Sequence, residues 1–517
     1  MFEVVRRLGI AALAACVLAA CSGNGSSGAA VDDSGARGSL IQNPPFRAAS
    51  LTAADLTAQL QSTPAGQQLL LVAGMPTCGV DVHYIQYGTV GGAGESTTAS
   101  GVLMVPTGAA SCTGKRPIVL YAHGTTTDRT YNLAAIADTT NAANGEAALV
   151  AAMFAAQGYI VVAPNYAGYD SSPLPYHPYL NADQQSKEMI DALTAARKAI
   201  GNVFASGTTD SGKLFVTGYS QGGHVAMATV RAMQGLTTPI TVTASAPMSG
   251  PYAMEAMGDA IFFGSVNIGA TVFTPLITTS FQKAYGNVYN ATTDVYEATY
   301  ATGIDTLLPS TTPLDQLFVE NKLPQTALFS STTPVTGNAT LDAALAVPSN
   351  PLFATGFGAS NLVLNSVRVA WALDALASPD GAVPTPQPGV PVAVAPQYGL
   401  RKDFKTNDLR NSAWFPTAPM LLCGGNADPT VFFSVNAQTM QAFWAGLPPG
   451  AVTVLDVDSA VTGPTDPFAA AKAGFAQAKA AVAAAGGQTA VVEEYHGTLV
   501  PPFCTAAARG FFGQFLP

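Results

Sequence analysis

The sequence predicts an α/β fold: a mostly parallel, doubly wound sheet that begins with an antiparallel hairpin and is interrupted by a mainly helical insertion. Three observations predict it. Short β-prone runs alternate with helical patterns between residues 117 and 245. Two strand-like runs flank a Gly-rich turn before this alternation begins. The alternation then stops from residue 251 to about residue 410 and resumes at residue 419.

Composition limits the functions to consider. A chain of 517 residues with 48% hydrophobic content can bury a large core, as one α/β domain with an insertion or as two domains. Only 10% of the residues are charged, and the formal net charge is -10. This acidic balance argues against a nucleic-acid partner. The sequence has no repeat of fixed period and no group of residues with metal-ligand spacing, so we expect no metal.

The N-terminus predicts export. Two arginines precede an apolar run, Leu8 to Ala20, which is too short to span a membrane and is typical of a secretory signal. The run ends in Leu-Ala-Ala-Cys21, which resembles a bacterial lipobox; the alternative is an ordinary cleavage site. We therefore expect a signal peptide at 1–20, lipidation of Cys21 and a flexible tether at 21–45. The mature protein would be an exported bacterial lipoprotein of the outer membrane or cell surface, facing the periplasm or released.

The cysteines predict two disulfides. Cys16 lies in the signal peptide, and four cysteines remain besides Cys21. They are Cys78, Cys112, Cys423 and Cys504. Four cysteines in an exported chain allow three pairings. We favour Cys78–Cys112, which brackets the N-terminal strands, and Cys423–Cys504, which would join two segments near the candidate site.

The elements before the insertion follow one another in a regular order. A short helix is expected at 52–62, capped by Thr52 and ended by Pro64. Runs at 83–90 and 99–105 form the hairpin. Further strands are expected at 117–122, 159–163, 214–217 and 240–245, and helices at 145–157, 182–200 and 224–233.

The insertion and the last part of the chain complete the organisation. Helical stretches at 254–263 and 362–376 precede a Pro-rich connector at 379–396, and strand-like runs follow at 419–423, 452–457 and 490–495 around an Ala-rich helix at 468–486. An excursion between two strands of one sheet is where a cap over an active site is inserted, although a separate domain is the alternative. We expect core segments at 46–250 and 411–517 and a helical cap or lid at 251–410.

A Gly-rich turn supplies the candidate nucleophile. The sequence Gly218-Tyr-Ser220-Gln-Gly222 lies between a strand-like run and a helical pattern. A serine raised above a sheet needs a sharp turn, and Gly218 and Gly222 leave room for it. The bare motif is weak in a chain with 50 glycines, so its strand-turn-helix context is what makes Ser220 the candidate.

A serine hydroxyl is a poor nucleophile near neutral pH, so it needs a histidine that takes its proton and a carboxylate that orients the histidine. The chain has five histidines. Four have unsuitable positions, before the serine, in a Pro-rich loop or on the helix after the serine: His83, His123, His177 and His224. The remaining one, His496, follows the run at 490–495 and precedes Gly497, a strand-end loop position that suits the base.

Asp428 is the candidate acid because it follows the strand at 419–423 in a loop. The order Ser220, Asp428, His496 is that of α/β-hydrolases. Four other carboxylates remain alternatives: Asp456, Asp458, Glu493 and Glu494.

An oxyanion formed in acyl transfer needs N–H donors aimed at it. They usually come from the residue after the nucleophile and from the loop after the third strand. Gln221 and Thr125 occupy these two places, and His123 and Gly124 would shape the second loop.

Taken together, these motifs resemble the secretory lipase family, the group that contains fungal lipase A. The resemblance covers most of residues 50 to 515 and rests on Ala122-His-Gly-Thr125, Pro164-Asn-Tyr-Ala-Gly-Tyr169, His177-Pro-Tyr-Leu180, Gly218-Tyr-Ser-Gln-Gly-Gly-His224, Trp414-Phe-Pro-Thr-Ala-Pro-Met420 and Asp428. It implies an α/β-hydrolase with a helical lid that hydrolyses carboxylic esters, including triacylglycerols, without a cofactor. The chain departs from the family at Asn165, where an Asp is common, and in the long stretch between Asp428 and His496.

We therefore expect an exported serine carboxylic-ester hydrolase, a lipase or carboxylesterase, that works through an acyl-enzyme. Its partners would be an ester substrate and the membrane that holds the anchor. One alternative is a peptidase or acyltransferase that uses the same residues, because a fold does not determine the leaving group. The other is a non-catalytic surface lipoprotein that binds a lipid or a partner.

Overall fold

Nine strands form one mixed sheet, with order β13-β12-β9-β8-β6-β7-β5-β4-β3. The computed structural model describes residues 30–31, 35–203, 207–382, 392–411 and 413–516. The pairings from β13 to β7 are parallel and those from β7 to β3 are antiparallel. The strands are β3 Phe46–Leu51, β4 Gly79–Val90, β5 Ser96–Thr107, β6 Lys115–Ala122, β7 Ile160–Pro164, β8 Thr209–Tyr219, β9 Ala244–Met248, β12 Met420–Gly424 and β13 Val452–Asp456. The predicted fold class is confirmed.

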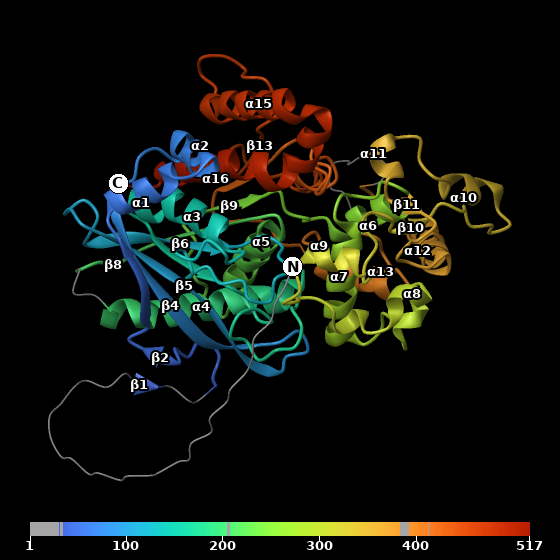
Figure 1. The fold of residues 1–517 in the computed structure, drawn as a ribbon, viewed down its shortest axis with the longest axis horizontal. Coiled ribbons are helices and arrows are strands. Elements are labelled where there is room, and N and C mark those ends of the chain that lie inside the picture. The colour runs from blue at the N-terminus through green and yellow to red at the C-terminus, as the bar shows by residue number, and fades with distance from the viewer. Residues whose placement is uncertain (1–29, 32–34, 204–206, 383–391, 412, 517) are drawn as a thin grey trace, which may run out of the picture.

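Helices cover both faces of this sheet (Figure 1). On one face, α4 Ala182–Val203 and α5 Gln221–Gly235 pack against each other and the central strands. On the other, α2 Pro64–Ala73, α3 Asn144–Met153 and α16 Val500–Gly513 pack together. The central strands are buried on both sides, which explains their continuous apolar sequences.

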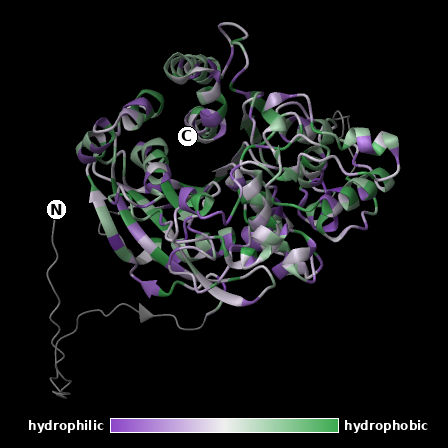
Figure 2. Ribbon diagram, turned by 45° about the vertical axis from the view of Figure 1, so that its right-hand side comes forward, coloured by the Kyte–Doolittle hydropathy of each residue, from purple (hydrophilic) through white to green (hydrophobic). Residues whose placement is uncertain are grey.

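The segment between β9 and β12 is mainly helical and forms a lobe beside the sheet, at the right of Figure 1. Its elements are α6 Met254–Phe262, α7 Ala270–Tyr285, α8 Ala298–Ala301, α9 Leu314–Val319, β10 Phe329–Ser330, α10 Ala339–Ala344, α11 Pro351–Ala354, β11 Phe357–Gly358, α12 Asn365–Ala377 and α13 Gly399–Asn407. This insertion has its own cluster of buried apolar side chains, separate from the cluster around the sheet. In Figure 2 its helices show hydrophobic and hydrophilic residues side by side, as expected for helices that bury one face.

The described residues contain several further elements. They are β1 Ala30–Val31, β2 Gln42–Asn43, α1 Ala53–Gln61, α14 Ala437–Phe443 and α15 Ala469–Glu494, with short 3₁₀ turns at Ala155–Gln157, Thr292–Asp294 and Ile304–Thr306 and a π-helical turn at Tyr495–Leu499. Thr52 caps α1 as predicted, because its side chain accepts the Asp55 N–H while the Asp55 carboxylate accepts the Thr52 N–H.

Two predicted strands are wrong. Residues 490–494 belong to α15, beyond a kink at Gly487, and Tyr495 begins the following π-helical turn; Val491 and Tyr495, one helical turn apart, are the buried residues there. The strand expected at 240–245 lies later, at Ala244–Met248, because these residues pair with β8. The β-branched run before it is only partly buried and lies outside the ladder.

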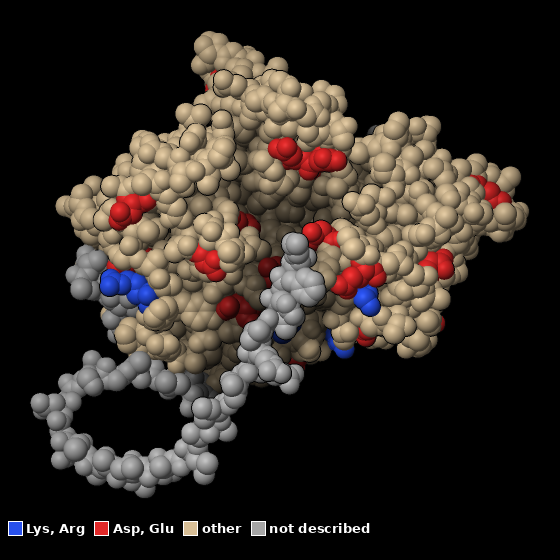
Figure 3. Space-filling model, viewed as in Figure 1, with Lys and Arg blue, Asp and Glu red and all other residues tan. Residues whose placement is uncertain are grey.

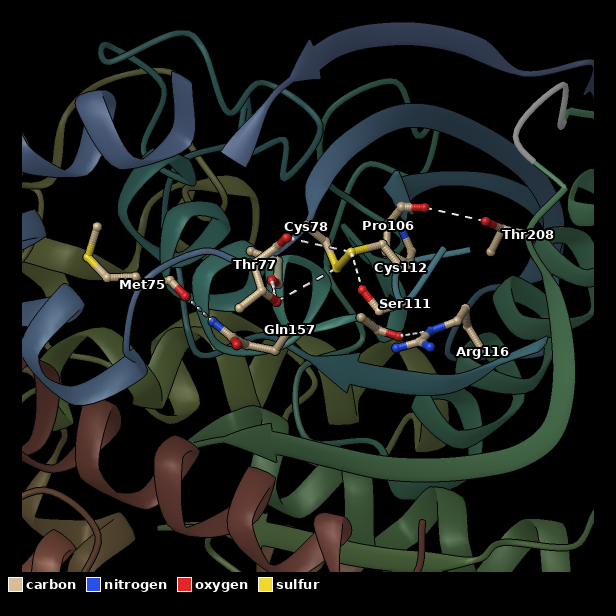
Figure 4. Close-up of a disulfide and its surroundings, with 11 residues drawn as sticks. Met75, Thr77, Cys78, Pro106, Ser111, Cys112, Arg116, Gln157 and Thr208 are labelled. Atoms are coloured by element: carbon tan, nitrogen blue, oxygen red, sulfur yellow. Dashed lines mark hydrogen bonds between the residues drawn. A yellow bond between two sulfur atoms is a disulfide. The ribbon is translucent and has the colours of Figure 1, made fainter. Parts of the chain in front are cut away.

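Both favoured disulfides are present. Cys78 and Cys112 join the start of β4 to the turn after β5, with an S–S distance of 2.02 Å. In Figure 4 this bridge lies beside Thr77, whose hydroxyl donates to Ala156 O at 3.0 Å, so the bridge lies near the 3₁₀ turn that follows α3. Cys423 in β12 is joined to Cys504 in α16.

Several predictions fall outside the described residues. The signal peptide at 1–20 and Cys21 lie wholly outside them, and the tether at 21–45 and the connector at 379–396 lie partly outside.

In the part of the chain that the structure describes, no helix is both long enough and apolar enough to cross a membrane. The same residues contain no cluster of potential metal ligands. The visible face in Figure 3 carries few charged side chains.

Candidate active site

Ser220 stands at the sharp turn between β8 and α5. Its backbone has φ 58 and ψ -121, a conformation that residues with side chains rarely adopt. The two glycines of the motif are needed for close backbone packing. A Cβ at Gly222 would lie 1.9 Å from Ala122 O, and one at Gly218 would lie 2.4 Å from Gly222 O. The turn therefore holds the hydroxyl of Ser220 above the carboxyl end of the sheet.

Three predicted side chains form one hydrogen-bonded row. Ser220 Oγ lies 2.8 Å from His496 Nε2, and His496 Nδ1 lies 2.7 Å from Asp428 Oδ2. An ionised carboxylate can only accept, so Nδ1 carries a proton and Nε2 is free to accept from the serine. This arrangement can move a proton from the serine hydroxyl to the imidazole.

Asp428 is held by the backbone of its own loop. Its Oδ1 accepts the N–H groups of Thr430 at 2.9 Å and Val431 at 3.0 Å, while Oδ2 faces His496. The residue is 4% exposed. These two bonds fix the orientation of the carboxylate.

His496 lies on the π-helical turn Tyr495–Leu499 and not in the strand-end loop that the sequence predicted. The turn places an extra residue between α15 and α16, and such turns are frequent at functional sites. Tyr219, next to the serine, donates its hydroxyl to His496 O at 2.5 Å, and the two rings lie 5.2 Å apart. The residue before Ser220 thus holds the turn that carries His496.

None of the alternative carboxylates bonds to His496 within the described residues. Asp456 accepts the Asn426 N–H at 3.1 Å, which steadies the loop that leads to Asp428. Asp458 accepts the Tyr495 hydroxyl at 2.7 Å and pairs with Lys479 at 2.6 Å. Glu493 is exposed and Glu494 half-buried on α15. The two aspartates therefore support the loop and turn around the row.

The predicted oxyanion loop lies beside the nucleophile. Ala122 at the end of β6 pairs with Gly218, and a Cβ at Gly124 would lie 3.8 Å from Ser220 Cβ. Among the described residues, neither the Thr125 N–H nor the Gln221 N–H has a hydrogen-bond acceptor. Both groups are therefore available to an oxygen bound there.

Sequence reasoning missed Glu146. This residue of α3 accepts the Gly124 N–H at 3.1 Å and the Tyr121 hydroxyl at 2.7 Å through Oε1, and the Tyr131 hydroxyl at 2.6 Å through Oε2. It therefore fixes the position of the loop before Thr125. A single acid in an otherwise apolar helix is the only sequence signal for it.

The other histidines have different surroundings. His123 is buried with its two ring nitrogens 2.7 Å from Gly124 O and 3.1 Å from Asn165 O, and burial lowers its pKa. His224 is buried on α5 and its Nε2 donates to Asn407 O at 2.9 Å. His83 is buried in β4. His123 and His224 thus bond backbone carbonyls, and none of the three rings has a hydrogen bond to the Ser220 hydroxyl among the described residues.

An apolar cavity of about 80 Å³ opens onto Ser220 and Gln221. Most of its lining residues belong to the insertion, chiefly to α6 and α7, and the sheet part contributes the loops at Tyr179 and Val431. The lining from the insertion includes Met254, Met257, Ile261, Phe262, Ala270, Phe273, Thr274, Ile277, Leu328 and Phe404. Such a wall suits an apolar group attached to the atom that Ser220 would attack.

Comparisons with known proteins agree with this site. A model described as the prolyl oligopeptidase family matches residues 146–237, a segment that contains Ser220. The rice cell wall degrading esterase LipA from Xanthomonas oryzae is 26% identical with a TM-score of 0.62, over 89% of this chain and 98% of that chain. No curated protein matches the chain.

Two more distant structures show less. A Legionella pneumophila protein is 17% identical with a TM-score of 0.61, over 92% of this chain and 98% of its own, and shows the same fold. Candida antarctica lipase A is 11% identical with a TM-score of 0.42, over 81% and 76%, so the resemblance to the secretory lipase family stays a prediction. The chain has the α/β-hydrolase fold, and its matches support a serine hydrolase.

Proposed function

We propose that the protein is an exported serine carboxylic-ester hydrolase, with Ser220 as nucleophile, His496 as general base and Asp428 as the orienting acid. The observation that carries the proposal is the hydrogen-bonded row from Asp428 through His496 to Ser220, which ends at an apolar cavity. The likeness to an esterase over most of both chains supports the same reaction.

In the proposed reaction, Ser220 Oγ attacks the ester carbonyl carbon while His496 Nε2 takes the hydroxyl proton. The oxyanion accepts the N–H groups of Thr125 and Gln221. His496 then gives its proton to the departing alcohol oxygen, and the acyl-enzyme remains. A water molecule attacks this acyl-enzyme with His496 again as base, which releases the acid and restores Ser220.

The cavity supports an ester with an apolar acyl group as substrate, including acylglycerols. Its walls are mainly hydrocarbon, so a charged or strongly polar acyl part would lose hydration there with few replacement bonds. Lipidation of Cys21 would keep the enzyme at a membrane, where such substrates collect. This last part rests on the sequence alone, because Cys21 lies outside the described residues.

A peptidase is the second candidate, because the family model that matches the segment around Ser220 is named for oligopeptidases. The two candidates share the serine, histidine and acid and differ in the leaving group. p-Nitrophenyl esters of increasing chain length and chromogenic peptides, assayed with one preparation, separate them. We expect ester turnover without peptide turnover.

The direct test uses variants of the row. Ser220→Ala and His496→Ala should each lower kcat by on the order of 10⁴ or more, and the double variant hardly further, because the residues act as a unit. Asp428→Asn should lower kcat in the same way, since it presents the wrong partner to Nδ1. Asp456→Asn is the matched control, and it should lower kcat less than Asp428→Asn does. Near-normal turnover of His496→Ala would refute the proposed mechanism.

A further inference from the structure

The segment His177–Tyr179 contacts both residues of the proposed oxyanion hole, although it lies far from them in the sequence. His177 and Tyr179 come from the loop between β7 and α4 and are 1% and 4% exposed. One bonds the side chain of Gln221 and the other bonds the side chain of Thr125. The two N–H donors therefore share one support.

His177 holds Gln221. Its Nε2 lies 2.7 Å from Gln221 Nε2, and its Nδ1 lies 2.9 Å from Ala167 O. Since a carbonyl only accepts, Nδ1 carries the proton and Nε2 accepts from the amide of Gln221. Burial lowers the pKa of His177 to about 3, so the ring stays neutral and keeps this arrangement near neutral pH.

The bond to His177 is the main restraint on the Gln221 side chain. Gln221 is 1% exposed, and its Oε1 has no partner among the described residues. A change at His177 would therefore release the side chain of the first residue of α5. The backbone N–H of that residue is the proposed donor, so its direction would become less well defined.

Tyr179 holds Thr125. Its hydroxyl lies 2.7 Å from Thr125 Oγ1. The backbone N–H of Thr125 has no acceptor among the described residues. The Tyr179 ring also lines the apolar cavity and stacks on Phe273 of α7, with ring centroids 6.5 Å apart. The support of Thr125 therefore reaches the insertion.

The loop itself is rigidly placed. The ring of His177 stacks on Tyr166, with centroids 5.4 Å apart, and lies 4.7 Å from the ring of Tyr169. Leu180, which follows Tyr179, has φ 54, a strained value that packing must enforce. Such a loop can fix the direction of groups bonded to it.

We propose that His177 and Tyr179 are positioning residues that together fix the oxyanion hole, His177 through Gln221 and Tyr179 through Thr125. This inference rests on the proposed function, since the hole is defined by that reaction. Neither side chain touches the reacting atoms. Both act on the transition state by keeping the Thr125 and Gln221 N–H groups aimed at one point.

The test is a double-mutant cycle in the full-length protein with p-nitrophenyl butyrate as substrate. Tyr179→Phe keeps the ring in the cavity and removes only the hydroxyl. We expect kcat to fall about tenfold with KM unchanged, less than the loss of a whole donor. In a Thr125→Val background, Tyr179→Phe should have no further effect, because its partner is already absent.

The same cycle applies to the other half, with His177→Phe and Gln221→Leu. A second readout is the inhibition constant of a trifluoromethyl ketone, whose adduct with Ser220 carries the oxyanion. Tyr179→Phe and His177→Phe should raise this constant by the factor by which they lower kcat. A purely structural role would change the melting temperature without this proportionality.

Tyr176→Phe is the matched control. It lies on the same loop, is buried, and donates its hydroxyl to Glu95 at 2.6 Å, away from the serine. We expect its kcat to stay within about twofold of the parent. The positioning role would be overturned if Tyr179→Phe and Thr125→Val lowered kcat additively and left the inhibition constant of the trifluoromethyl ketone unchanged. Reaction of Ser220 with a fluorophosphonate would show that the proposed function still holds in that case. If the unchanged protein did not react with the fluorophosphonate at Ser220, the proposed function itself would be refuted.

Discussion

The sheet part and the insertion are stabilised by different interactions. The central strands pack apolar side chains against helices on both faces, and the two disulfides lie in this part. The insertion has buried ion pairs in addition to its own apolar cluster. Arg401 bonds Asp259 at 2.8 Å and Asp374 at 3.2 Å, and Arg410 lies 2.7 Å from both Asp380 and Asp408.

The difference shows how a lobe of short helices can be held in one arrangement. Arg401 bonds α6 and α12 to α13, so one guanidinium joins three helices of the insertion. A buried ion pair adds little net stability over an apolar replacement, but removing one partner leaves an uncompensated charge. We therefore expect the insertion to respond to charge changes and the sheet part to respond to cavities and reduction.

Removal of a buried guanidinium should have the largest effect on stability. Arg401→Met leaves Asp259 and Asp374 buried without their cation, and we expect a loss of about 3 to 5 kcal/mol in the free energy of unfolding. Chemical denaturation measures it. Lys187→Met, which removes a surface pair with Asp183, is the control and should change little. If Arg401→Met lowered the free energy of unfolding no more than Lys187→Met, the stability of the insertion would not depend on its buried charges.

Removal of one disulfide should separate stability from activity within the sheet part. Replacing Cys423 and Cys504 by alanine should lower stability by roughly 2 to 4 kcal/mol and also lower kcat, because this bridge joins the strand before Asp428 to the helix after His496. Replacing Cys78 and Cys112 should lower stability with kcat retained, since that bridge joins the start of β4 to the turn after β5 and neither segment carries Ser220, Asp428 or His496. If both double variants kept full turnover, the first bridge would have no part in placing the site.

The smallest expected effect is a slope of stability against pH. Burial raises the pKa of Glu255 in α6 from 4.5 to about 8 and that of Glu188 in α4 from 4.5 to about 7. Between pH 4.5 and the raised pKa of each group, the folded protein keeps a proton that the unfolded chain has released. The stabilisation is complete below about pH 4.5 and is lost as the pH rises through 7 and 8, by at most about 1.4 kcal/mol per pH unit for each group.

Two glutamine variants assign this slope to the two parts. Glu255→Gln should flatten the profile up to about pH 8 and Glu188→Gln only up to about pH 7. Denaturation midpoints at pH 5, 6, 7 and 8 are the measurement. The apolar control Leu120→Ala should lose about 2 to 5 kcal/mol equally at each pH. A profile unchanged by both glutamine variants would contradict the raised pKa values.

The sequence predicted the sheet and the serine turn because both depend on local patterns. Strands β6, β7 and β8 each contain a buried, mainly apolar run, and the turn at Ser220 has a motif of its own. The choice of Asp428 and His496 was possible because they follow Ser220 in the order that α/β-hydrolases have. The row that joins them adds distances that no pattern contains.

The errors have physical causes. The run Ala490-Val-Val-Glu-Glu-Tyr495 has β-branched residues, but it follows an Ala-rich helix and buries Val491 and Tyr495 on one helical face, so tertiary packing decides. Glu146 was missed because its three donors lie 15 to 25 residues before it, at the end of β6 and in the loop that follows, and this separation matches no helix or strand period. Contacts between distant residues leave no periodic trace in the sequence.

The bridge between Cys423 and Cys504 also determines what happens when a protease cuts the chain. The exposed helix α15, which projects at the top of Figure 1, lies wholly between these two cysteines. A single cut within it produces two fragments that remain covalently joined, with Asp428 on one and His496 on the other. The disulfide thus makes the longest exposed helix near the site a place where the backbone can be nicked without separating acid from base.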